Sequence, residues 1–183
     1  MCQGLRYGDV AKLRITITRS DEVTFQVQSP TPRRPVRLFP VIALDLTDRA
    51  REVKQVDRAW ADAAISEAQA AGVDDALIVD QRGRLGESSS ANVFIVRKDG
   101  TVATPPRGGI VAGVVRNWIL EERYAKEELV FLQDLPKCRE VFLSTAGRGI
   151  VPVASVGDLH FSNHSEAERL HRRWAELPRG LPS

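Results

Sequence analysis

The chain has 183 residues, of which 43% are hydrophobic and 27% charged, so it fits a soluble globular domain with enough apolar residues for a sizeable core. Its 26 basic and 24 acidic residues are interspersed and leave a formal net charge of +2, which gives no strong field for nucleic acid or anionic lipid. There is no secretion-type start and no apolar run of about 18 residues, so we expect a cytoplasmic protein that neither spans a membrane nor binds nucleic acid.

The first part of the chain is predicted to form a β-hairpin followed by a linker. Residues 12–18 and 22–28 each alternate apolar and polar side chains, which is typical of two half-buried strands. Residues 29–35 contain three prolines and are expected to run extended and exposed. Several basic residues in and around this region are expected to be solvated, namely Arg19, Arg33, Arg34 and Arg37.

The remaining residues predict strands alternating with helices, which indicates an α+β or mixed α/β fold. Residues 57–71 are rich in alanine and predict a helix that Gly72 ends in a left-handed cap. Two further helices are predicted at 114–127 and 163–177. Strands are predicted at 36–46, where Pro40 would confine the strand to an edge or a bulge, and at 76–80, 92–96, 101–104, 129–132, 141–144 and 150–156. We therefore divide the chain into residues 1–35 and a main domain of residues 36–183.

Four short motifs follow Lys54 in a fixed order. They are Glu87-Ser-Ser-Ser-Ala-Asn-Val-Phe, Thr104-Pro-Pro, Gly113-Val-Val-Arg and Gly149-Ile-Val-Pro-Val. A lysine or a glutamate taken singly is more often a surface or turn residue. In this order, however, the motifs resemble those of the class IV family of pyridoxal-phosphate enzymes, which includes branched-chain aminotransferases, D-amino acid aminotransferases and aminodeoxychorismate lyases.

This resemblance implies pyridoxal 5'-phosphate as the cofactor. Lys54 would form the imine with the cofactor and shuttle the substrate α-proton. Glu87 would hold the proton on the ring nitrogen, which keeps the ring an electron sink. The N–H groups of Gly113, Val114 and Val115 would face the phosphate at a helix N-terminus. The other cofactor contacts implied are Arg58, Ser90, Asn92, Ser144 and Thr145, with Arg148 adding positive charge.

The resemblance also implies the architecture and the class of substrate. Residues 36–183 would be the large C-terminal cofactor domain of the class IV fold, and residues 1–35 a remnant of its N-terminal domain. A homodimer acting on a small amino substrate is implied, either as an aminotransferase or as an aminodeoxychorismate-lyase-like enzyme. The sequence Ala146–Val153 favours the lyase-like form. One alternative is a shortened, catalytically silent relative that keeps the fold and dimer surface, and another is an unrelated α+β binding protein.

Histidine, cysteine and tryptophan residues suggest no further chemistry. The histidines lack a third ligand at a spacing suited to metal binding, so we expect solvated helix residues. The two cysteines have no ligand spacing either and are expected to be reduced and structural. The tryptophans lie at positions suited to the apolar faces of helices, where packing explains them. These residues are His160, His164, His171, Cys2, Cys138, Trp60, Trp118 and Trp174.

Overall fold

The computed structural model describes residues 11–18, 20–29, 31–42 and 59–177. The chain forms two compact units, residues 1–33 and residues 34–183. Within the described ranges, no helix has the length and apolar character needed to cross a membrane.

The smaller unit contains a two-stranded antiparallel hairpin, β1 (Lys12–Ile17) and β2 (Val23–Gln28). The predicted hairpin is therefore confirmed, and its strands match the expected ranges to within one residue. The register places the apolar side chains of both strands opposite one another on one face, because residues that pair directly share a face. Nearly all of these side chains are exposed, whereas half-burial was expected.

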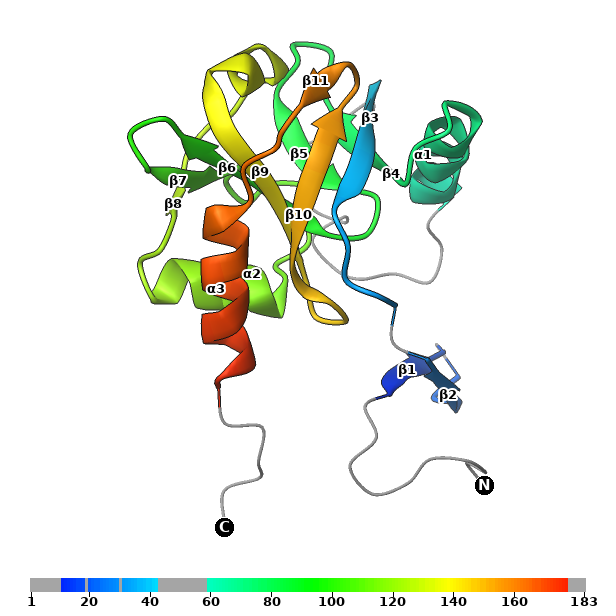
Figure 1. The fold of residues 1–183 in the computed structure, drawn as a ribbon. Coiled ribbons are helices and arrows are strands. Elements are labelled where there is room, and N and C mark those ends of the chain that lie inside the picture. The colour runs from blue at the N-terminus through cyan, green and yellow to red at the C-terminus, as the bar shows by residue number, and fades with distance from the viewer. Residues whose placement is uncertain (1–10, 19, 30, 43–58, 178–183) are drawn as a thin grey trace. The chain divides into compact units, whose positions relative to one another are not determined.

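The larger unit is built on a nine-stranded sheet, most of which closes on itself (Figure 1). The strands are β3 (Val36–Ile42), β4 (Asp75–Val79), β5 (Leu85–Ser88), β6 (Asn92–Arg97), β7 (Val102–Thr104), β8 (Lys126–Glu127), β9 (Cys138–Thr145), β10 (Gly149–Val156) and β11 (Leu159–His160). Because β9 pairs with both β6 and β10, the strands β10, β3, β4, β5, β6 and β9 form a closed ring. The mixed α/β class that the sequence predicts is confirmed.

Three helices cover the outside of this ring: α1 (Ala59–Ala70), α2 (Val114–Glu121) and α3 (Ser165–Ala175). Side chains alternate along each strand, so Leu77 of β4 packs inside the ring while Ile78 packs under α1. Under α2 and α3, Phe94 and Phe142 stack with ring centroids 4.9 Å apart. The strands are thus buried on both faces, and α1 covers a different part of the ring from α2 and α3 (Figure 1).

The proline in β3 is explained by a change of neighbours along the strand. β10 pairs with β3 only as far as Leu38, whereas β4 pairs with β3 as far as Ile42. Pro40 therefore lies where β3 has a neighbour on one side only, so its missing N–H removes no ladder bond to β10. The strand as a whole lies between two others, but its proline sits at a local edge, as the sequence predicts.

Two predictions in the middle of the chain are wrong. The helix predicted for 114–127 ends at Glu121, because Arg123 takes a left-handed conformation with φ of 57° and the chain then enters β8. No strand forms at 129–132: Phe131 makes an isolated bridge, and Leu132 begins a short 3₁₀ helix, η2 (Leu132–Lys137). β5 was not predicted, since its four residues include Gly86 and two polar residues that hide any alternation.

The other helices agree with the sequence. α1 and α3 lie within the predicted ranges, and Gly72 follows α1 with φ of 72°. Trp118 and Trp174 pack against each other at 5.3 Å between centroids, but Trp60 is exposed, so the expectation of burial fails there.

Two of the arginines expected to be solvated have a partner. Arg34 and Arg37 are exposed, yet both contact the carboxylate of Asp74, at 2.7 and 3.4 Å. This acid lies just before β4, and Arg37 belongs to β3, so the pairs tie the start of β3 to the start of its neighbour.

Candidate functional site

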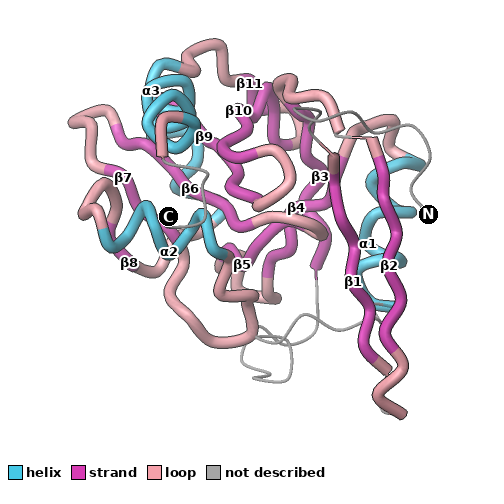
Figure 2. The backbone as a smooth tube through the Cα atoms, turned by 90° about the horizontal axis from the view of Figure 1, so that it is seen from below, coloured by secondary structure: helices cyan, strands magenta, loops and turns pink. Residues whose placement is uncertain are grey.

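A row of buried polar side chains crosses the outer face of the ring. Glu87 of β5 pairs with Asn92 of β6, and Asn92 pairs with Ser144 of β9. Residues that pair directly across strands share a face, so these three side chains lie next to one another. Each is at most 4% exposed. In Figure 2, β4 and β5 lie between α1 and α2.

Within the described ranges, two donors contact the carboxylate of Glu87. Its Oε2 accepts a hydrogen bond from the backbone N–H of Val111 at 3.2 Å and a longer one from Nδ2 of Asn92 at 3.4 Å. The same Nδ2 donates to the carbonyl of Val111 at 2.8 Å. A buried carboxylate is costly without such partners, so these bonds keep the group in one orientation.

Helix α2 begins directly beside this carboxylate. Gly113 is its N-cap residue and has no side-chain capping bond. A Cβ at this position would lie 2.3 Å from Oδ1 of Asn92, so only glycine allows the helix to begin so close. The first N–H groups of a helix have no partner within the helix and carry partial positive charge. Val115 is buried in the core, so its N–H group rather than its side chain is what it offers to a ligand.

Ser144 carries a hydroxyl that has no hydrogen-bond partner among the described residues. Its Oγ is buried, and within the described ranges no donor or acceptor lies in reach. An unsatisfied buried hydroxyl costs about 1–3 kcal/mol, so such groups in native proteins call for an explanation. The hydroxyl, the carboxylate and the helix N-terminus together suit a ligand with an anionic group and a protonated nitrogen.

The other residues that the sequence singled out have different surroundings. Lys54 and Arg58 lie outside the described residues. The hydroxyl of Ser90 donates to Asp75 at 2.9 Å, away from Glu87 in the hydrogen-bond network. Thr145 is the last residue of β9, and adjacent residues of a strand face opposite sides, so it does not share the face of Ser144. In the turn that follows, burial lowers the pKa of the Arg148 guanidinium.

Sequence reasoning missed two residues of this region. Val111 contributes only backbone atoms, so no side-chain pattern could reveal it. Asp75 accepts from both Ser89, at 2.5 Å, and Ser90, and so holds the serine-rich turn between β5 and β6. The only signal for it is an acid at the start of a strand, far from the turn in sequence.

The prediction that the histidines are solvated holds only in part. His171 is half-buried, and its Nδ1 accepts a hydrogen bond from the N–H of Ile150 at 3.4 Å, so the prediction of a solvated residue is wrong there. His160, which precedes the predicted helix 163–177, is exposed on β11, in agreement with the expected solvation. Among the residues that the structure covers, no three His, Cys, Asp or Glu side chains are grouped so as to hold a metal ion.

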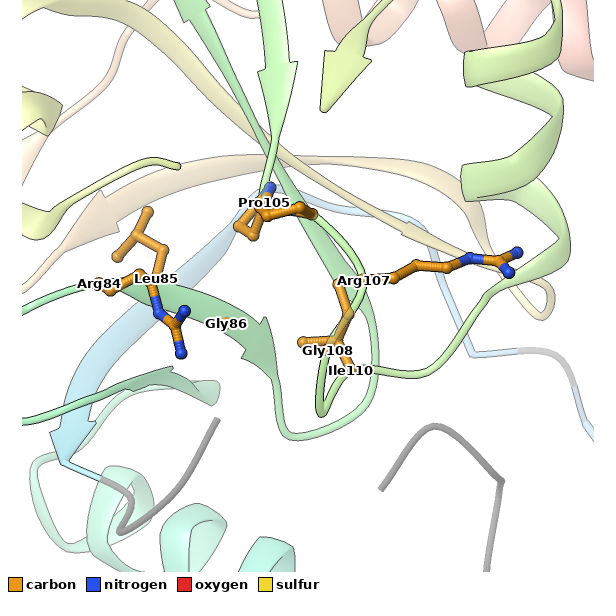
Figure 3. A pocket seen from close by; sticks show the side chains of 8 residues that line it. Arg84, Leu85, Gly86, Pro105, Arg107, Gly108 and Ile110 are labelled. Carbon is orange, nitrogen blue, oxygen red and sulfur yellow. The ribbon is translucent and has the colours of Figure 1, made fainter. Parts of the chain in front are cut away.

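A small cavity lies beside the row, with a volume of about 110 Å³ (Figure 3). Two of its lining residues, Gly86 and Ile110, directly precede Glu87 and Val111 in the chain. The side chain of Arg107, which also lines it, extends away from Gly86 in Figure 3. Pockets for small molecules are usually about 300–1,000 Å³, so this cavity by itself is too small for a phosphorylated aromatic ring.

Comparison with known proteins identifies relatives of this site and fold. A branched-chain-amino-acid aminotransferase of Pseudomonas aeruginosa is 31% identical over 104 residues, which are 51% of this chain and 32% of that protein. A solved structure from Legionella pneumophila, provisionally assigned as a 4-amino-4-deoxychorismate lyase, has a TM-score of 0.75 at 25% identity and covers 84% of this chain and 60% of its own.

A third comparison shows the same fold at lower identity. An aminotransferase from Brucella abortus, bound to the cofactor PLP, has a TM-score of 0.71 at 21% identity and covers 84% of this chain and 59% of its own. The chain thus spans less than two thirds of the length of each of these proteins.

The family whose pattern matches is described as amino-transferase class IV, and the match covers residues 3–156. This match takes in the hairpin, the row formed by Glu87, Asn92 and Ser144, and every strand of the ring. It removes the alternative of an unrelated α+β binding protein. The chain belongs to the class IV aminotransferase family.

Proposed function

We propose that this chain forms the cofactor-binding part of a pyridoxal-phosphate-dependent class IV aminotransferase or aminodeoxychorismate-lyase-like enzyme. Its substrate would be an amino acid or an amino-chorismate type compound. The observation that carries the proposal is the buried carboxylate of Glu87, which two donors fix beside the uncapped start of α2.

The residues present fit the cofactor at both ends. Bound pyridoxal phosphate supplies an electron sink, provided that its ring nitrogen stays protonated. The carboxylate of Glu87 would hold that proton, since an anion next to a protonated nitrogen favours the charged form. The N–H groups of Val114 and Val115 would bind the phosphate, because a helix N-terminus attracts anions. The unpartnered hydroxyl of Ser144 is a further donor within the same row.

Lys54 is proposed as the amine that holds the cofactor and moves the α-proton of the substrate. This assignment rests on the order of the sequence motifs. The contact proposed for Arg58 rests on the same basis. Ser90 and Thr145 are left out of the proposed site, because the Ser90 hydroxyl bonds Asp75 and Thr145 faces away from Ser144. Asn92 would act through Glu87, because its Nδ2 bonds both that carboxylate and the carbonyl of Val111.

Titration with pyridoxal phosphate tests this proposal. The purified protein is expected to develop the visible absorbance of lysine-bound cofactor, and Lys54→Ala is expected to abolish it. Glu87→Gln should keep the covalent attachment but reduce turnover by about 10²-fold or more, since the charge opposite the ring nitrogen is lost. Absence of any band in the unaltered protein at millimolar cofactor would favour the silent relative. A Glu87→Gln protein with full turnover would contradict the role of Glu87.

Two assays distinguish aminotransferase activity from lyase activity. We favour the lyase-like form from the sequence Ala146–Val153, while the Pseudomonas relative is a branched-chain aminotransferase. Release of an aromatic amine from an aminodeoxychorismate would support the lyase form. Exchange of an amino group between a branched-chain amino acid and a 2-oxo acid would support the aminotransferase. Sedimentation analysis of the same preparation tests the proposed homodimer.

A further inference from the structure

We propose that Arg116 is a positioning residue that, together with Glu127, fixes the segment 105–113 and thereby holds Glu87 and the start of α2 in place. The effect on the cofactor rests on the proposed function, whereas the effect on the segment does not.

Arg116 lies in the first turn of α2 and is 1% exposed. Its Nη2 donates to the carbonyl of Pro105 at 2.9 Å and to Oε1 of Glu127 at 2.5 Å. A buried guanidinium needs such partners, since an unpaired charge inside a protein is strongly unfavourable. The helix is therefore joined to the Pro-Pro bend by a side chain that has little freedom to move.

Glu127 extends this connection to Arg107, the residue that follows the Pro-Pro bend. The same Oε1 also accepts from the backbone N–H of Arg107, at 3.3 Å. The hydrogen bond from Arg116 is the main cause that holds the pKa of this carboxyl below its ordinary range. One carboxylate oxygen on β8 thus joins the start of the segment to the first turn of α2.

The other end of the segment reaches the candidate site. The N–H and the carbonyl of Val111 bond Glu87 and Asn92, and Gly113 contacts Asn92. Between the two ends lie Gly108 and Gly109, both at positive φ, in a stretch without helix or strand. Glycines have the widest conformational freedom, so this stretch depends on its ends for order. Loosening the Glu127 end is expected to loosen the bond from Val111 to Glu87.

The neighbouring residue provides a matched control. Glu128 directly follows β8, and among the described residues its carboxylate forms ion pairs with Arg97 and with Lys126 rather than with the segment. Truncating it removes a similar charge at the same edge of the sheet. Any general effect of damage to this edge should therefore appear in both variants.

The experiment compares Glu127→Ala with Glu128→Ala in the full chain. In cofactor-free protein, amide hydrogen exchange at Val111 is expected to be about fivefold or more faster in Glu127→Ala and within about twofold of the unaltered protein in Glu128→Ala. In absorbance titrations, the dissociation constant for pyridoxal phosphate is expected to rise about five- to tenfold in Glu127→Ala only.

The outcomes separate the two proposals. Unchanged Val111 exchange in Glu127→Ala, or an equal change in Glu128→Ala, would overturn the positioning role. Faster exchange in Glu127→Ala alone supports it. If that result came with no cofactor binding by the unaltered protein, the proposed function would fail while the positioning role would stand.

Discussion

At the scale of single residues, Gly113 and Asn92 share a space that has no room for another atom. A methyl group at position 113 would lie 2.3 Å from the amide oxygen of Asn92, and that oxygen cannot move without disturbing the bonds of Nδ2. We predict that Gly113→Ala lowers the free energy of unfolding by about 1–3 kcal/mol, as overpacking usually does, and weakens cofactor binding. Urea denaturation and cofactor titration measure the two effects.

Gly147→Ala is the control for this substitution. A Cβ there has no atom within 4 Å and the backbone is not at positive φ, so the free energy of unfolding should change little. If both substitutions lowered the free energy of unfolding equally, the tight contact at Gly113 would not be the cause of the destabilisation.

Because Glu127 forms an ion pair with Arg116, we expect the order of the segment 105–113 to depend on pH. Arg116 lowers the pKa of this carboxyl from its ordinary value of 4.5, so the folded state favours the ionised form. The stabilisation of the folded state by the ionised Glu127 carboxylate is therefore complete above about pH 4.5. It is lost as the pH falls through the lower pKa that this group has in the folded state. We predict that Val111 exchange, corrected for its intrinsic pH dependence, accelerates below pH 4.5. Glu127→Ala should remove that extra dependence, and if the acceleration persists, another group causes it.

The sequence indicated several side chains of the site, but it did not indicate the hydrogen-bond partners that fix them. Glu87, Asn92, Gly113 and Ser144 were selected from motifs, and the structure brings them together on neighbouring strands and the start of one helix. The role of Val111 could not be predicted, because a backbone bond to a carboxylate depends on how a loop folds. The partner of Ser90 was also hidden, since Asp75 reaches it only through the pairing of β4 with β5.

At the scale of elements, the start of α3 depends on a carboxylate from another strand. Glu140 of β9 is fully buried, and its two oxygens accept from the N–H groups of Glu166 and Ala167 at 3.0 and 2.7 Å. Burial raises the pKa of Glu140 despite these bonds. Two of the N–H groups that a helix leaves without partners are thereby satisfied.

We predict that Glu140→Ala lowers the free energy of unfolding by about 2–4 kcal/mol, because it leaves two buried N–H groups unpaired and opens a cavity. Chemical denaturation measures this loss. Glu176→Ala, an exposed change at the other end of α3, should change the stability by less than about 0.5 kcal/mol. If Glu140→Ala also lowered the free energy of unfolding by less than about 0.5 kcal/mol, water would have replaced the carboxylate as the partner of the two N–H groups.

The elements that the sequence predicted correctly are those with a strong local pattern. The alternation in β1 and β2 and the alanine run of α1 were sufficient by themselves. The end of α2 was misplaced because Arg123 enters a left-handed conformation that a long basic residue rarely adopts, and no glycine marks the position. Phe131 and Leu132 suggest a strand, but Phe131 forms only an isolated bridge with Arg84 and Leu132 begins η2.

At the scale of the whole molecule, the ring and its helices use only residues of the larger unit. β1 pairs only with β2, whereas every strand from β3 to β11 belongs to the nine-stranded sheet. We predict that a protein shortened to residues 34–183 still unfolds cooperatively. Circular dichroism and amide protection in β6 and β9 measure this, with the full chain as reference. Loss of that protection would show that the larger unit needs residues 1–33 to fold.

Closure of the ring by β9 has a consequence for how the protein matures. Glu87 and Asn92 leave the ribosome well before Ser144, yet the three meet only when β9 pairs with β6. Until then a nascent chain carries two open sheet edges, which tend to pair with other chains. The candidate site is thus completed late in biosynthesis, and we expect a chain that ends before Cys138 to be prone to aggregate.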